Sequence, residues 1–79
     1  MTYLATFFTH SGAIKYEKHL QSLGIAITLM PVPRKLSSSC GVAARFDYDS
    51  TISSMISDDL HELYECQGLS YTLIYNADT

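Results

Sequence analysis

The chain has 79 residues, of which 47% are hydrophobic and 16% charged, and a formal net charge of −3. This length lies near the lower limit for an unaided hydrophobic core and predicts one domain over residues 1–79, while the apolar share excludes a disordered chain. Only 5 lysines and arginines are present, too few for a phosphate-binding surface, so nucleic acid is not an expected partner. No apolar run approaches the roughly 20 residues that span a bilayer, so we expect no membrane segment.

The first apolar run, residues 3–8, is rich in aromatic side chains and predicts a strand. No basic region precedes it, as one would in a secretion signal, so we expect a cytoplasmic protein. In that reducing compartment Cys40 and Cys66 are expected to be thiols, not a structural disulfide.

A helix is predicted next, because apolar residues recur at spacings of three and four between residues 13 and 23. Thr9 or Ser11 can cap its start, and Gly24 suits the left-handed position beyond its end. A second strand over residues 25–30 then ends at two prolines that cannot donate ladder hydrogen bonds.

A polar loop of about ten residues follows and could hold a short helical turn. Residues 41–46 predict a third strand, which could be an edge of the sheet. After turn-forming aspartates, apolar residues recur at helical spacing up to Gly68 and predict a second helix. The apolar positions of this helix are Ile52, Met55, Ile56, Leu60, Leu63 and Tyr64.

Residues 69–75 are strong strand formers and complete the order βαββαβ. This order predicts an α+β fold of the ferredoxin-like type, with a four-stranded antiparallel sheet and two helices on one face. The sheet face without helices leaves room for a homodimer.

In that fold the first two strands run parallel, so the loops that follow them leave the sheet at one end. His10 and Cys40 are therefore expected to lie together, beside the positive end of the first helix. The turn that contains Cys66 is expected at the same end. Arg34, Lys35 and His10 are candidate neighbours that would favour a nucleophilic thiolate.

The residues around Cys40 suit an exposed reactive loop. Gly41 allows close backbone approach beside the sulfur, and Ser37, Ser38 and Ser39 offer hydroxyl donors. Cys40 could instead be a small buried hydrophobe at the start of a strand.

The other candidate groups also have simpler interpretations. His10 could only cap the helix, and Cys66 could be structural or could form a reversible disulfide with Cys40. A metal site made of His10, Cys40 and Cys66 is geometrically conceivable, but no closely spaced ligand pair such as C-x-x-C is present, so no metal is expected.

One further pattern covers nearly the whole chain, and its central segment reads P-x-P-R-x-L-S-S-x-C-G. With this pattern the chain resembles the selenium/sulfur carrier-like proteins. The residues that carry this resemblance are Thr9-His10, Ala13, Glu17, Pro31, Pro33-Arg34, Leu36-Ser37-Ser38 and Cys40-Gly41.

The resemblance implies that Cys40 holds sulfur or selenium as a persulfide or selenide adduct, with no other cofactor. Donor and acceptor proteins would be the partners, and the chain would be a carrier more than an enzyme. By position, the residues that shape the loop would be Pro31, Pro33, Arg34, Ser37, Ser38 and Gly41, with His10 adjoining.

Two other functions fit the same residues. One is a regulatory module that binds a small ligand or a protein and in which Cys40 is structural. The other is a redox switch between Cys40 and Cys66, which requires α-carbons less than about 7 Å apart.

Overall fold

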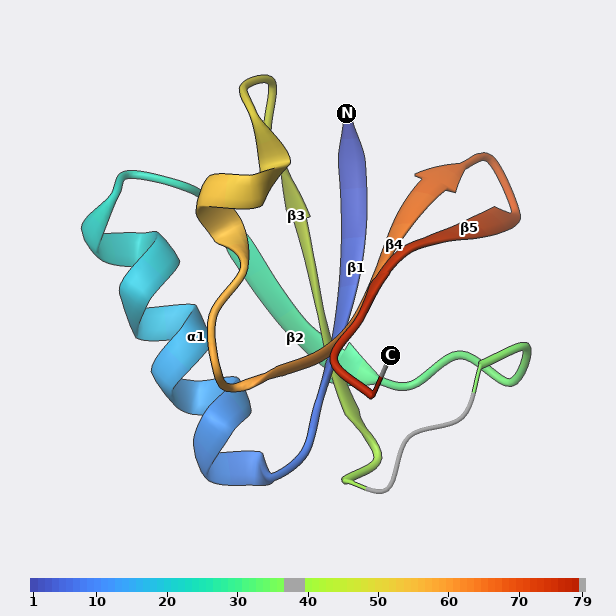
Figure 1. Ribbon diagram of the computed structural model, residues 1–79, viewed down its shortest axis with the longest axis horizontal. Coiled ribbons are helices and arrows are strands. Elements are labelled where there is room, and N and C mark those ends of the chain that lie inside the picture. The colour runs from blue at the N-terminus through green and yellow to red at the C-terminus, as the bar shows by residue number, and fades with distance from the viewer. Residues whose placement is uncertain (37–39, 79) are drawn as a thin grey trace.

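The computed structural model describes residues 1–36 and 40–78, which form one five-stranded sheet and one α-helix (Figure 1). The sheet order is β2-β3-β1-β4-β5, and every neighbouring pair is antiparallel. The elements in chain order are β1 (Thr2–Phe7), α1 (His10–Ser22), β2 (Ile27–Pro31), β3 (Val42–Asp47), the 3-10 helix η1 (Ile52–Met55), β4 (Leu60–Gln67) and β5 (Ser70–Asn76).

The first half of the chain has the predicted order of strand, helix, strand and strand. β1 and β2 both pair antiparallel with β3, so they run parallel to each other as expected. β3 lies between β2 and β1, so the alternative in which the third strand is an edge is wrong. β2 is the edge on this side, and Pro31 at its end suits an edge because proline cannot donate a ladder hydrogen bond.

Helix α1 begins at His10, earlier than the apolar spacing predicts, because Thr9 caps it. The Thr9 Oγ1 atom accepts a hydrogen bond from the Gly12 amide at 2.9 Å, so Thr9 is the cap and not Ser11. Beyond the helix, Gly24 has a φ of 79° and donates its amide to the Gln21 carbonyl at 3.0 Å. This is the left-handed position expected for a glycine after a helix.

The second half of the chain differs from the prediction. Among the described residues, the expected second helix is reduced to the short η1, and residues 60–67 form strand β4. β4 pairs with β1 on the side opposite β3, and β5 extends the sheet beyond it. The ferredoxin-like fold with four strands and two helices is therefore wrong.

A bulge explains why the sequence of β4 looked helical. Phe7 of β1 pairs with Leu60, whereas the preceding Thr6 pairs with Glu62, so His61 is an extra residue in β4. In a regular strand, residues three apart face opposite sides of the sheet. The bulge instead turns Leu60 and Leu63 to the same side, where both are fully buried. A spacing of three thus arises here without a helix.

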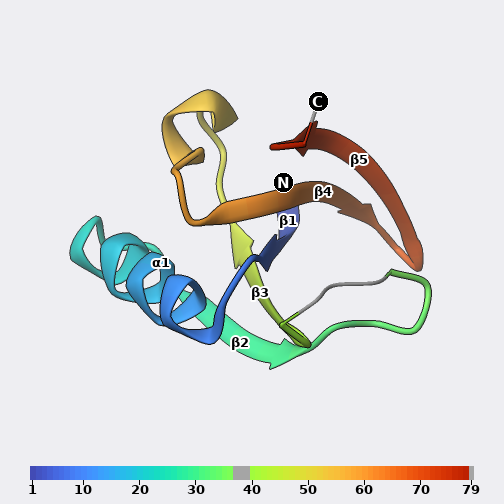
Figure 2. The same ribbon diagram turned by 60° about the horizontal axis from the view of Figure 1, so that its bottom comes forward.

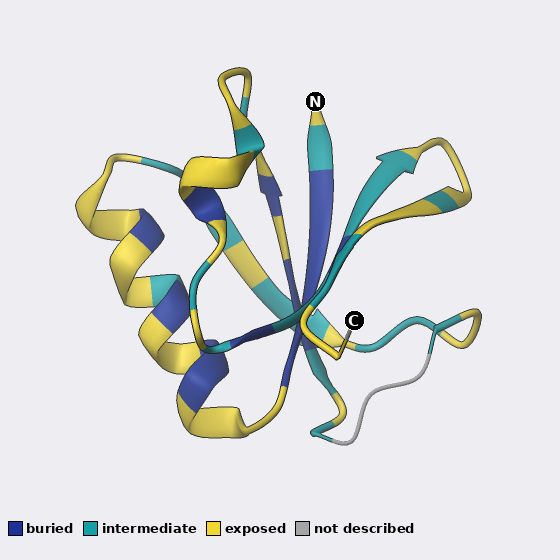
Figure 3. Ribbon diagram, viewed as in Figure 1, coloured by how far each residue is buried: buried dark blue, intermediate teal, exposed yellow. Residues whose placement is uncertain are grey.

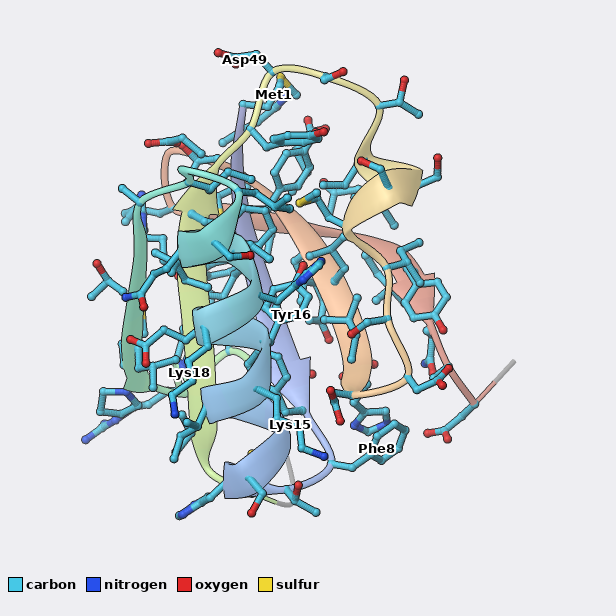
Figure 4. All side chains as sticks on the ribbon, turned by 90° about the vertical axis from the view of Figure 1, so that its left-hand side faces the viewer. Met1, Phe8, Lys15, Tyr16, Lys18 and Asp49 are labelled. Atoms are coloured by element: carbon cyan, nitrogen blue, oxygen red, sulfur yellow. The ribbon has the colours of Figure 1, made fainter. Side chains whose placement is uncertain are left out.

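The main core lies between the sheet and the layer formed by α1 and η1. Figure 3 shows the buried positions of α1 on the side that faces the sheet, and Figure 4 shows Tyr16 pointing the same way. The Tyr16 hydroxyl donates a 2.7 Å hydrogen bond to the Met55 carbonyl, which ties α1 to η1. The buried residues of this core are Tyr3, Ala5, Phe7, Ala13, Tyr16, Leu20, Ala44, Phe46, Met55, Leu60 and Leu63.

β1 is buried on its other face as well, since Leu4 and Thr6 are both 0% exposed. The β4–β5 hairpin and the loop after β2 lie on the side of the sheet away from α1 (Figures 1 and 2). They touch where the Lys35 ammonium donates to the Leu69 carbonyl at 3.0 Å. The loop that carries Cys40 is thereby connected to the tip of the hairpin.

Within residues 1–36 and 40–78, no helix is long and apolar enough to cross a membrane.

Replacing Leu60 with alanine tests the strand assignment. Because the side chain is fully buried in the main core, Leu60→Ala should lower the free energy of unfolding by about 2–5 kcal/mol. Leu73→Ala is the matched control, since Leu73 lies in β5 and is 48% exposed; its cost should stay below about 1 kcal/mol. Urea unfolding measures both, and equal losses would contradict the core that we describe.

Because of Tyr16, the free energy of unfolding should depend on pH in the alkaline range. Burial raises the pKa of Tyr16 well above the ordinary value of about 10. The unfolded chain therefore loses this proton first, and the stabilisation present below pH 10 is lost as the pH rises further. Tyr16→Phe should cost about 1 kcal/mol at pH 7, from the lost bond to Met55, and almost nothing at pH 11. Urea unfolding at the two pH values checks this, and a constant difference would refute it.

Candidate functional site

The loop after β2 is closed at its base by main-chain contacts. Pro31 and Val42 are the last partners of the β2–β3 pair, and the Val32 amide donates to the Gly41 carbonyl at 3.2 Å. A turn follows in which the Leu36 amide donates to the Pro33 carbonyl at 3.0 Å. The described part of the loop thus holds a turn at the place where a short helical turn was expected.

Gly41 is required at its position by its backbone conformation. Its φ is 72°, a value that residues with a side chain rarely adopt. Among the described residues other than its chain neighbours, none lies within 4 Å of a Cβ atom built here, so the constraint is the dihedral angle. Gly41 is itself exposed and directly follows Cys40 in the chain.

His10 and Cys40 lie together, as the parallel β1 and β2 predict. The His10 Nε2 atom is 2.6 Å from the Cys40 carbonyl oxygen. A carbonyl only accepts hydrogen bonds, so Nε2 carries the proton and donates. Because Thr9 caps the helix, His10 is not needed as its cap, and its side chain instead anchors the main chain of Cys40.

The Cys40 side chain is half buried at the rim of the main core and is not in a disulfide. Its Sγ atom donates to the Val42 carbonyl at 3.4 Å. The sulfur therefore sits where the loop joins β3, with a protein carbonyl as an acceptor for its proton. This hydrogen bond must break before the sulfur can act as a nucleophile, because only the thiolate attacks.

The two basic loop residues, Arg34 and Lys35, are both exposed. The Lys35 ammonium is directed to the Leu69 carbonyl at the hairpin tip and not to Cys40. Arg34 precedes it in the same turn. The expected hydroxyl donors Ser38 and Ser39, with Ser37, lie outside the described residues.

Cys66 does not lie at this site, so the prediction that it shares the end of the sheet with Cys40 is wrong. Cys66 pairs with Thr2 at the start of β1, whereas Ala43, three residues after Cys40, pairs with Thr6. The distance along β1 between these two pairs alone is about 13 Å. The error follows from the missing second helix, since β4 runs antiparallel to β1 and carries Cys66 to the far end.

The separation of the two cysteines exceeds the α-carbon limit of about 7 Å for a disulfide. A redox switch between Cys40 and Cys66 in one chain is therefore not supported, nor is a metal site made of His10, Cys40 and Cys66. Cys66 is half buried, and this burial is the main cause that raises the pKa of its thiol; nearby Glu65 raises it further, whereas Arg45 lowers it. Both the burial and the raised pKa lower the reactivity of the Cys66 thiol.

Sequence reasoning missed Val42 and Leu69 as contacts of the loop. Leu69 lies in a two-residue turn between Gln67 and Ser70, in which Gly68 has a φ of 61°. This is the glycine position of a type II′ hairpin turn. A glycine between two runs of strand-forming residues was the available signal, but the predicted helix concealed it.

Comparison with known proteins concerns the same residues. Searches of curated proteins and of solved structures return no match. The model of one family, described as "Putative Se/S carrier protein-like", matches residues 2–75. This range includes His10, Cys40 and the whole loop between β2 and β3, in agreement with the resemblance seen in the sequence. The chain therefore belongs to the Se/S carrier protein-like family.

Proposed function

We propose that this protein carries sulfur or selenium as an adduct on the Cys40 thiol and passes it to an acceptor protein. The observation that carries the proposal is the placement of Cys40, whose carbonyl is bound by His10 while its thiol lies half buried beside an open glycine. Membership of the family supports sulfur or selenium as the cargo.

The chemistry would be two thiol-exchange steps without net oxidation or reduction. After losing its proton, the Cys40 sulfur attacks the outer sulfur of a donor persulfide. The sulfur–sulfur bond of the donor breaks, a new one forms on Cys40, and the donor leaves as a thiolate. The acceptor thiolate then attacks the outer sulfur, which restores the Cys40 thiolate. With selenium as cargo, the outer atom is selenium.

Three contacts support this role by holding the loop while the sulfur exchanges partners. His10 binds the Cys40 carbonyl, the Val32 amide binds the Gly41 carbonyl, and Lys35 binds the hairpin tip. None of these contacts uses the sulfur atom, so the sulfur can change its bonds while the loop stays in place. The positive end of α1, which begins at His10, lies on the same side and would stabilise a thiolate or persulfide anion.

One observation favours the second candidate function, a binding or regulatory module in which Cys40 is structural. The Cys40 side chain packs against the edge of the main core and its thiol donates a hydrogen bond, as a structural cysteine does. The two functions differ in one measurable property, which is whether a sulfur atom is transferred to Cys40.

Intact-mass analysis after incubation with a small persulfide donor tests the carrier. The wild type should gain the mass of one sulfur atom, and Cys40→Ser should gain none. Cys66→Ser is the matched control, and it should still gain one sulfur because Cys66 lies at the far end of β1. An adduct that persists in Cys40→Ser, or none in the wild type, would leave Cys40 a structural residue.

His10 should act as a positioning residue for this transfer. Removal of a hydrogen bond worth about 1 kcal/mol should make His10→Ala take up sulfur about fivefold more slowly. His10→Gln should recover most of the rate, because its amide can also donate to the Cys40 carbonyl. The shape of the pH–rate profile should stay the same in both variants. If glutamine rescues nothing, or the profile changes shape, the ring has a different role from the one we assign.

A further inference from the structure

The charges of this protein are divided along the chain. Residues 18–46 contain four basic side chains and no acidic one, so this segment has a formal charge of +4. The remaining residues contain one basic and eight acidic side chains, a formal charge of −7. An overall charge of −3 therefore conceals one basic segment, and that segment contains Cys40.

In the structure this division along the chain becomes a division in space. Residues 18–46 form the end of α1, β2, the loop and β3, which make up one side of the sheet (Figure 1). Of the acidic residues, Glu62 and Glu65 lie in β4 on the other side of β1 and Asp78 follows β5, whereas Glu17 lies in α1 and Asp58 and Asp59 lie between η1 and β4. Asp47 pairs with Thr2 at the far end of β3, and Asp49 binds the N-terminal amine at 2.8 Å. These two acids are therefore remote from Cys40.

The charges nearest the site in sequence are not neutralised. Arg34 and Lys35 are exposed, and in the described part of the chain no carboxylate lies within ion-pair distance of either. Lys35 binds a carbonyl, which leaves its full positive charge in place. Asp59 opposes them in part, since it lies beside Gly12 in the first turn of α1.

From this arrangement we infer that the Cys40 side of the molecule is a docking surface for proteins with acidic side chains around the exchanging sulfur. The inference rests on the proposed function and names the partner that it requires. Arg34 and Lys35 attract such a partner and repel a basic one. The acidic remainder of the molecule repels an acidic partner elsewhere, so encounter is directed to Cys40.

Peptide disulfides of defined charge test this inference on the full chain with Cys66→Ser as background. Each peptide has a central cysteine joined to 2-thiopyridine and flanked by four aspartates, four serines or four lysines. Attack by the Cys40 thiolate forms a disulfide with the peptide and releases thiopyridone, whose absorbance gives the rate. Dividing each rate by that of the serine peptide removes differences in thiolate fraction, because the same thiolate attacks all three.

At low ionic strength the aspartate peptide should react about tenfold faster than the lysine peptide. The ratio should fall towards one at 0.5 M salt, where screening acts over a few ångströms. The double variant Arg34→Glu/Lys35→Glu should reverse the preference, and Arg34→Gln/Lys35→Gln should abolish it.

The matched control is Lys18→Glu/Arg45→Glu. It changes the net charge equally within the same basic segment, but Lys18 lies in the second half of α1, and Arg45 pairs with Leu4 in the middle of the sheet. It should alter the ratio less than twofold. A wild-type ratio near one, or an equal shift in both double variants, would overturn the inference.

Failure of this inference can be told apart from failure of the carrier function. The peptide rates depend on access and charge around the Cys40 sulfur and need no persulfide. A protein that takes up sulfur with no charge preference would retain the carrier function alone. A charge preference without sulfur uptake would retain the docking surface alone.

Discussion

The structure depends first on the burial of β1, which is paired along both edges and covered on both faces. All five residues from Tyr3 to Phe7 are buried, so every other element takes its position relative to this strand. α1 begins directly beyond its end, where Thr9 caps the helix and His10 follows. β3 pairs along one edge of β1, and its start brings Cys40 to the same end. The meeting of His10 and Cys40 is thus a consequence of how β1 is built into the sheet.

The candidate site anchors the main chain around Cys40 as well as its thiol, which donates to the Val42 carbonyl. His10 binds the carbonyl of Cys40, and the loop is closed at Val32 and Gly41. The carrier function that we propose requires the sulfur to accept an atom from one protein and give it to another, so the sulfur needs access from outside and has to change its bonds. Anchoring the peptide lets the sulfur change its bonds while the loop keeps its shape.

The same arrangement explains why the two cysteines differ. Cys40 lies where a loop enters the sheet, close to a histidine and on the basic side of the molecule. Cys66 lies within β4 at the opposite end of β1, where burial is the main cause that raises the pKa of its thiol. The residues next to each cysteine in the sequence do not distinguish these surroundings. Both cysteines follow polar residues, and neither has a second cysteine nearby. The sheet places one at the site and the other away from it.

The sequence by itself determined the elements up to β3, the parallel run of β1 and β2 and the basic segment around Cys40. These features are local, or follow from the order of a few neighbouring elements. Only the tertiary structure decided that residues 60–67 are a strand, that Cys66 is remote and that Lys35 meets Leu69. Periodicity reports which side chains share a face, and the bulge at His61 lets a strand produce the spacing of a helix. The choice between the two came from pairing with β1, more than fifty residues away, which no local pattern encodes.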